Sequence, residues 1–136
     1  MRFETIAIHG HGGPDPAYGA VMTPIYQTST FRFEDVGATS GFEYTRLGNP
    51  TRQALETLLA ALEGGVGAVA AASGMGAISI ALAVLEAGAH VLCTRDCYGG
   101  TYRLLAHLQR QGTLEVSFLD LSDPAAREQA LKKSMK

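Results

Sequence analysis

The pattern of apolar and polar residues changes near residue 50. Beyond that point four leucines recur at i, i+3, i+4 and i+7, namely Leu55, Leu58, Leu59 and Leu62. Asn49-Pro50-Thr51 precedes them with proline in the first turn, and Gly64-Gly65 follows them. The spacing predicts a helix with one apolar face between these two signals.

Short apolar runs alternate with helical segments through the rest of the chain. Strands are predicted at 66–72, 90–94 and 114–119, and helices at 74–85, 98–111 and from Asp123-Pro124 to the chain end. Strands that alternate with helices pair in parallel through crossover connections. The expected fold class is therefore α/β with a mostly parallel sheet.

Residues 1–49 carry glycine and proline at short intervals and show no sustained helical period. This composition predicts an extended arm with turns and little independent structure. An arm of this kind needs a surface to lie on. The expected organisation is an arm at 1–49 followed by an α/β domain at 50–136.

Composition and charge narrow the classes of partner. The 136-residue chain is 46% hydrophobic and carries a formal net charge of −2, with a pI near 6.0. Without a basic field it is not expected to hold nucleic acid or an anionic membrane, so small molecules or other protein chains are the expected partners. The charge-free stretch between Glu63 and Glu86 approaches the length of a membrane span, but its glycines and serines make insertion weak. With two cysteines and no signal-peptide core at its start, the chain is expected to be cytoplasmic.

Ser73-Gly74-Met75-Gly76 lies between a predicted strand and a predicted helix, where open parallel sheets bind ligands. Unpaired N–H groups and the positive end of the helix dipole favour an anion there, and glycine lets the anion approach. The sequence therefore predicts a phosphate or carboxylate on the N–H groups of Gly74 and Met75. The alternative is that the two glycines only make a tight turn and let helix and sheet pack closely.

A second loop, Arg95–Thr101, follows the next predicted strand and is expected at the same edge of the sheet. Tyr98 in this loop is suited to stack on a planar ring held by the first loop, or else is a half-buried tyrosine with its hydroxyl in water. Arg46, in Tyr44-Thr45-Arg46, is suited to bidentate phosphate binding, or else is a solvated surface charge.

A metal site is a weaker hypothesis. Cys93 and Cys97 are four residues apart and His9-Gly10-His11 is a local pair, but zinc requires three or four converging ligands. No metal site is therefore expected. Cys97 is either a reactive thiol at the loop or, as is more usual for its type, a small buried residue.

Five ordered stretches resemble the amino-terminal part of the Cys/Met-metabolism family of pyridoxal-phosphate (PLP) enzymes, such as cystathionine γ-synthase and cystathionine γ-lyase. They are Tyr18–Phe31, Phe42–Arg52, Leu62–Gly65, Ser73–Ala77 and Asp96–Arg103. The resemblance runs from about Thr5 to the chain end. It implies the large-domain fold of PLP-dependent transferases of the aspartate aminotransferase type (fold type I), with residues 50–136 as its first, incomplete part.

The resemblance also implies roles for individual residues. The amides matching Gly74 and Met75 bind the cofactor phosphate, and the tyrosine matching Tyr98 stacks on the pyridine ring and helps to deprotonate the substrate amine. The residues matching Tyr44 and Arg46 reach the phosphate of a neighbouring subunit's cofactor. The resemblance therefore implies a homo-oligomer joined through the arm, with a homotetramer as the expected assembly.

The sequence departs from the family pattern in what it lacks. Family members hold the cofactor through a lysine in a Ser-x-Thr-Lys stretch and pair its pyridine nitrogen with an aspartate. No such lysine stretch occurs here, and lysine is found only at Lys132, Lys133 and Lys136. A truncated chain that is inactive alone is therefore expected.

The loop around Tyr98 bears on the subtype. Asp96–Gly100 followed by Tyr102-Arg103-Leu104 is most similar to γ-synthases, which replace the γ substituent of an activated homoserine with cysteine. Gly100 stands where methionine γ-lyases usually carry cysteine, which disfavours that subtype. Elimination from cystathionine by a γ-lyase, and a non-catalytic phosphate-binding or association module, stay open as alternatives.

Overall fold

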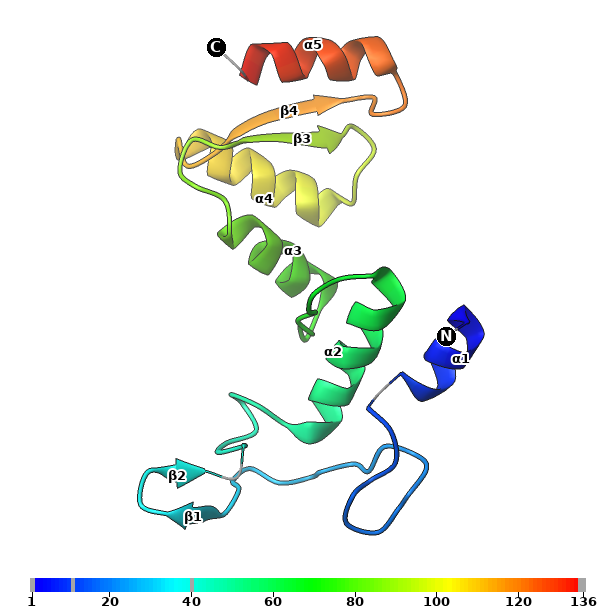
Figure 1. Cartoon of the computed structure of the whole chain (residues 1–136). Helices are drawn as coiled ribbons and strands as arrows, with labels where there is room; N and C mark the ends of the chain where they lie inside the picture. Colours follow the sequence, from blue (N-terminus) through cyan, green and yellow to red (C-terminus); the bar gives the residue numbers. More distant parts are fainter. Residues whose placement is uncertain (1, 11, 40, 135–136) are drawn as a thin grey trace. The chain divides into compact units, whose positions relative to one another are not determined.

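The chain forms two compact units, Met1–Ala70 and Ala71–Lys136. The computed structural model describes residues 2–10, 12–39 and 41–134, with side chains as far as Lys132 (Figure 1). The boundary between the units falls after the first long helix. The division into an arm at 1–49 and a domain at 50–136 stays a prediction.

The first unit contains two helices and one short hairpin. These are α1 (Phe3–His9), β1 (Phe33–Asp35), β2 (Ala38–Thr39) and α2 (Pro50–Glu63), and β1 pairs with β2 antiparallel. The α1 helix packs against α2, and Gly10 at its end lies so close to Leu58 that a β-carbon there would be 2.9 Å from the Leu58 Cδ1 atom. The expectation of little independent structure in residues 1–49 was wrong at α1, because seven residues are too few to show a helical period.

The ends of α2 follow the sequence signals. The side chain of Asn49 accepts a hydrogen bond from the Thr51 N–H at 2.9 Å, and Pro50 occupies the first turn. Gly64 ends the helix in the left-handed conformation (φ 66°), with its N–H donating to the Ala60 carbonyl. The predicted helix between Asn49 and Gly64 is confirmed.

The second unit is a parallel strand pair with helices before, between and after the strands. Its elements are α3 (Gly74–Ala83), β3 (His90–Thr94), α4 (Gly99–Arg110), β4 (Glu115–Leu119) and α5 (Pro124–Ser134). The strands β3 and β4 run parallel, in a register that pairs His90 with Glu115 and Thr94 with Leu119. The predicted α/β class with parallel strands is confirmed.

The predicted strand at 66–72 is not formed. This segment carries neither helix nor strand, and Val66 and Val69 are exposed. A strand requires a neighbouring backbone, and no described segment pairs with this one. Its Ala70 N–H donates instead to the Glu56 carboxylate at 2.9 Å.

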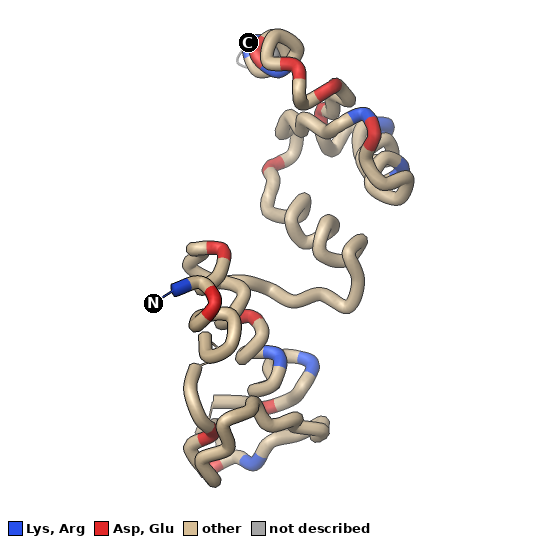
Figure 2. The backbone as a smooth tube through the Cα atoms, turned by 90° about the vertical axis from the view of Figure 1, so that its right-hand side faces the viewer, with Lys and Arg blue, Asp and Glu red and all other residues tan. Residues whose placement is uncertain are grey.

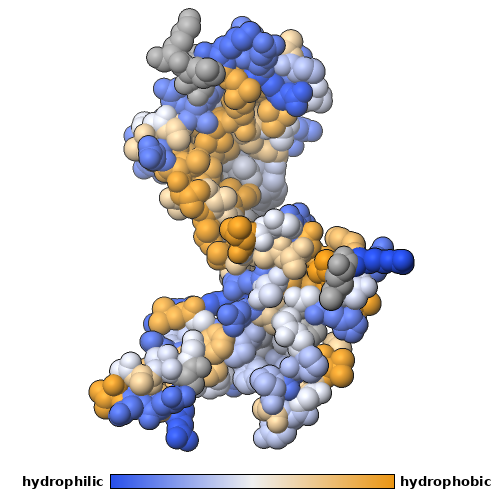
Figure 3. Space-filling model, in the orientation of Figure 1, coloured by the Kyte–Doolittle hydropathy of each residue, from blue (hydrophilic) through white to orange (hydrophobic). Residues whose placement is uncertain are grey.

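A small apolar core lies between the strand pair and its helices. Leu105 of α4, Leu114 and Val116 are buried, and they contact a half-buried shell of Leu82, Ala89, Val91, Cys93, Leu108 and Phe118. Apolar side chains also reach the surface over α3 and α4 (Figure 3). The α3 helix carries no charged residue (Figure 2). Within the described residues, no helix has the length and apolar character needed to cross a membrane.

Candidate functional site

The first turn of α3 offers two unpaired N–H groups. Ser73 precedes the helix in an extended conformation (φ −157°, ψ 159°), and its hydroxyl accepts from the Gly76 N–H at 3.0 Å. The Ser73 carbonyl accepts the next bond, from the Ala77 N–H at 3.0 Å. No described residue accepts a hydrogen bond from the N–H of Gly74 or Met75. Capping by Ser73 therefore leaves two donors for a ligand.

These two donors suit an anion. The positive end of the helix dipole lies at the same place, and no acidic residue occupies the first turn of α3. A β-carbon built on Gly74 would meet no atom of another segment within 4 Å, so the space beside its Cα is open. The donor set fits a phosphate group.

The loop after β3 carries Tyr98 at the start of α4. The Thr94 hydroxyl donates to the Asp96 carboxylate at 2.7 Å, and the Arg95 N–H donates to the Leu119 carbonyl at 3.0 Å, which fixes the loop on the strand ends. Tyr98 precedes α4, and its carbonyl accepts from the Tyr102 N–H. Tyr98 is 70% exposed as a residue, and its hydroxyl has no described hydrogen-bond partner.

The two loops of the second unit meet at Gly100. A β-carbon built on Gly100 would lie 2.9 Å from the Met75 sulfur and 2.5 Å from the Tyr98 Cε1 atom. Both side chains therefore approach the same point. The structure brings Met75 and Tyr98 together, as the prediction of adjacent loops requires.

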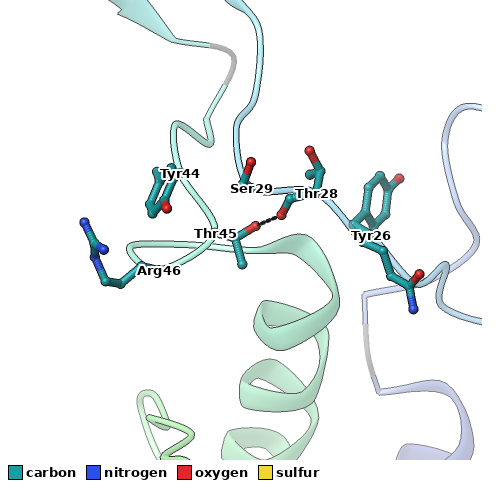
Figure 4. Close-up of a pocket in the computed structure, with 7 residues that line it drawn as sticks. Tyr26, Thr28, Ser29, Tyr44, Thr45 and Arg46 are labelled. Atoms are coloured by element: carbon teal, nitrogen blue, oxygen red, sulfur yellow. Dashed lines mark hydrogen bonds between the residues drawn. The ribbon is translucent and has the colours of Figure 1, made fainter.

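Tyr44 and Arg46 line a pocket in the first unit. The pocket has a volume of about 500 Å³ and is lined by Tyr26, Gln27, Thr28, Ser29, Tyr44, Thr45 and Arg46 (Figure 4). The Arg46 guanidinium carbon lies 4.9 Å from the centre of the Tyr44 ring, in cation–π contact. Arg46 is exposed and has no carboxylate partner among the described residues.

Backbone hydrogen bonds hold the turn that carries these two residues. The Thr45 N–H donates to the Ser29 carbonyl at 2.9 Å, and the Thr45 hydroxyl donates to the Thr28 carbonyl (Figure 4). Asn49 is buried and donates to the Tyr26 carbonyl at 3.0 Å. The segment at 26–29 is thereby joined to the turn at 44–46.

The predicted site residues fall into two groups. Gly74, Met75 and Tyr98 belong to the second unit, and Tyr44 and Arg46 belong to the first. Sequence reasoning gave no role to Thr28 and Ser29, although both lie within one of the stretches that carry the resemblance. Their carbonyls hold the turn at 44–46 through hydrogen bonds from Thr45, about 17 positions away, and a local sequence pattern does not reveal such a contact.

The cysteines do not form a metal site in the described chain. No group of three or more His, Cys, Asp or Glu side chains comes together among the described residues, and His11 lies outside them. Cys93 and Cys97 are free thiols, both half-buried. Burial, followed by the hydrogen bond and charge of Cys97, raises the pKa of Cys93 from 9.0 to about 11.

Comparison with known proteins gives one family. The family model described as Cys/Met metabolism PLP-dependent enzyme matches residues 4–136. A protein of Herpetosiphon aurantiacus described as a probable cystathionine gamma-synthase is 48% identical, over 96% of this chain and 41% of its own length. The cystathionine gamma-lyase of Bacillus subtilis is 40% identical, over all of this chain and 36% of its own length.

Solved structures agree with these relatives. The crystal structure of cystathionine gamma synthase from Xanthomonas oryzae pv. oryzae, in complex with aminoacrylate and cysteine, matches with a TM-score of 0.88 and 40% identity. The match covers 98% of this chain and 35% of that one. The chain thus spans well under half of the relatives it matches. The match of the family model over residues 4–136 shows that the chain belongs to the Cys/Met metabolism family of PLP-dependent enzymes.

Proposed function

We propose that this chain provides the phosphate-binding part of the PLP site of a transsulfuration enzyme. The observation that carries the proposal is the pair of unpaired N–H groups on Gly74 and Met75, at the first turn of α3. Backbone donors at a helix start, with no side chain on Gly74 to obstruct them, suit the dianionic phosphate of PLP. The family membership of the chain supports PLP as the ligand.

Tyr98 is the proposed partner of the cofactor ring. It lies beside Met75 and is largely exposed, which suits a ring that stacks on a bound ligand. When bound, PLP withdraws electrons from the α-carbon of an amino-acid substrate. The Tyr98 side-chain oxygen has no described partner, and in its phenolate form it would accept a proton from the substrate amine and become the neutral hydroxyl.

Tyr44 and Arg46 are proposed to serve the cofactor of a neighbouring subunit in a homo-oligomer. Arg46 offers an exposed guanidinium with no described carboxylate partner, and the hydrogen bonds of Thr45 fix the turn that carries it. A planar guanidinium binds phosphate oxygens in pairs. The pocket beside it is lined in part by Gln27, Thr28 and Ser29, whose polar side chains can bond to a charged ligand group.

For the subtype we propose a cystathionine γ-synthase, which joins cysteine to an activated homoserine. The support is the 48% identity to the Herpetosiphon relative, compared with 40% to the Bacillus γ-lyase. A γ-lyase acting on cystathionine is the second candidate, because its likeness covers the whole chain. The two are distinguished by assaying the complete enzyme with cysteine plus activated homoserine, and separately with cystathionine alone.

The proposed phosphate site is tested by deleting one N–H without disturbing the helix. Gly74 is the first helical residue, and Ser73 before it has the extended conformation that proline requires of its predecessor. Gly74→Pro therefore removes one donor and keeps α3. Loss of a hydrogen bond to a charged group corresponds to an affinity for PLP weaker by about tenfold or more.

Gly74→Ala is the matched control, because it keeps the N–H and places its β-carbon in open space. Equilibrium dialysis with PLP and with pyridoxal, which lacks the phosphate, measures the effect. We expect Gly74→Ala to bind PLP like the wild type, and Gly74→Pro to approach the weak binding of pyridoxal. Equal PLP affinity in the two variants, with α3 intact, would refute the site.

A further inference from the structure

Gly100 provides the space in which two side chains of the proposed site meet. It lies in the first turn of α4, one residue after Gly99. A β-carbon on Gly100 would lie 2.5 and 3.1 Å from two atoms of the Tyr98 ring and 2.9 Å from the Met75 sulfur. The approach of both side chains therefore depends on the missing β-carbon.

The backbone itself does not require glycine at this position. Gly100 is not among the glycines with positive φ, so its conformation is open to any residue. Gly99 is also helical, and a β-carbon placed on it would meet no other atom within 4 Å. Of these two adjacent glycines, only Gly100 is needed for a close approach of side chains.

The contact at Gly100 joins the two loops of the second unit. The Met75 sulfur and the Tyr98 ring both lie within reach of one point, in the range of a sulfur–aromatic contact. Met75 is also the residue whose N–H is left unpaired at the start of α3. A side chain at Gly100 would therefore displace the ring of Tyr98 and the side chain of Met75, whose N–H is one of the two phosphate donors.

We propose that Gly100 is a positioning residue that holds the Tyr98 ring against Met75, whose N–H is one of the two unpaired donors at the start of α3. The inference rests on the proposed function. A side chain at Gly100 displaces the free ends of Tyr98 and Met75 rather than backbone, so Gly100→Ala folds but loses the contact. Gly99→Ala is the matched control, with the same change in helix propensity and no steric effect.

The contact is measured without any cofactor. Nuclear Overhauser effects between the Met75 methyl group and the Tyr98 ring, in the 136-residue chain, report it directly. We expect the signal in the wild type and in Gly99→Ala, and its loss in Gly100→Ala. Persistence of the signal in Gly100→Ala would overturn the proposal, as would unfolding of that variant.

Ligand binding gives the second measurement. We expect Gly100→Ala to bind inorganic phosphate within twofold of the wild type, and to bind PLP about fivefold more weakly because the stacking contact of the ring is lost. Gly100→Ala is expected to have no further effect when Tyr98 is already alanine. An equal loss in both backgrounds would show that Gly100 does not act through Tyr98.

These outcomes separate the inference from the proposed function. If the wild-type chain bound neither phosphate nor PLP, the proposed function would fail, and the Overhauser signal would still decide the steric role of Gly100. If PLP bound normally to Gly100→Ala while the contact was lost, the positioning role would be wrong and the phosphate site would stand.

Discussion

Asn49 is a buried polar residue whose amide joins three segments of the first unit. Its side-chain NH₂ donates to the Tyr26 carbonyl at 3.0 Å and to the Thr45 hydroxyl at 3.1 Å, while its carbonyl oxygen accepts from the Thr51 N–H. A buried amide with each of these bonds made is stabilising, and removing it leaves several partners unpaired. Asn49 thus adds to the hydrogen bonds of Thr45 that hold the turn presenting Arg46.

The Cys93 thiol gives stability a dependence on alkaline pH. Its pKa is raised from 9.0 to about 11, first by burial and then by the hydrogen bond and charge of Cys97. The folded state therefore keeps a proton that the unfolded chain releases. This contribution is complete below pH 9 and disappears as the pH rises through about 11.

We expect the melting temperature of the wild type to fall between pH 9 and 11 more steeply than that of Cys93→Ala. Alanine is small and apolar and does not ionise, so the variant lacks the thiol whose pKa differs between the folded and unfolded states. Thermal melts followed by circular dichroism at several pH values measure both slopes. Parallel slopes would show that Cys93 does not carry the effect.

Single residues also show what the sequence did and did not reveal about the site. Gly74, Met75 and Tyr98 were identifiable because each lies at a loop between a predicted strand and a predicted helix or matches a family motif. The close approach of Met75 and Tyr98 at Gly100 was not identifiable, because it depends on how two loops 25 residues apart pack. Local spacing contains no information on such contacts.

At the scale of elements, the residues that begin and end a helix made its bounds predictable from the sequence. The α2 helix begins at an asparagine cap with proline in its first turn and ends at a left-handed glycine, and its predicted bounds are confirmed. The strands β3 and β4 were predicted within a residue of their bounds, since both pack on the buried core. The segment 66–72 has equally apolar residues but no partner strand in the described chain, so composition alone misled.

The C-terminal glycine of α2 gives a prediction for this element. Gly64 has φ 66°, where a β-carbon is strained, and Gly67 has no positive φ and nothing within 4 Å of a β-carbon. We expect Gly64→Ala to lower the free energy of unfolding by about 1 kcal/mol, and Gly67→Ala to leave it unchanged or raise it slightly. Urea titrations of the two variants measure the difference. Equal effects would contradict the role of Gly64 as the helix cap.

At the scale of the whole molecule, the two units carry residues proposed to serve the cofactors of different subunits. The second unit holds the phosphate donors and Tyr98, and the first holds Tyr44 and Arg46. The fold class and the family were predictable from the sequence, because motif order and strand–helix alternation extend over most of the chain. The division after Ala70 was not, since it depends on contacts rather than on composition.

The lysines of this 136-residue chain bear on whether it can catalyse the reaction alone. No Ser-x-Thr-Lys stretch is present, and Lys132, on α5, pairs with Glu128 at 2.7 Å on the surface. We expect no turnover of cysteine with an activated homoserine above the rate with free PLP, because Lys132, the one lysine whose side chain is described, is exposed and paired with Glu128. A spectrophotometric assay for cystathionine measures this. Turnover well above the free-PLP rate would contradict it.

The measurement that tests the central claim most directly is a ¹H–¹⁵N correlation spectrum of the chain, titrated with PLP. Phosphate binding at α3 predicts saturable shifts that are largest at the Gly74 and Met75 amides. The start of α5 serves as an internal control, because Asp123 already accepts from the Ala125 N–H at 2.9 Å, and it is expected to shift little. Saturation without shifts at Gly74 and Met75, or larger shifts at α5, would contradict the assignment of the phosphate site.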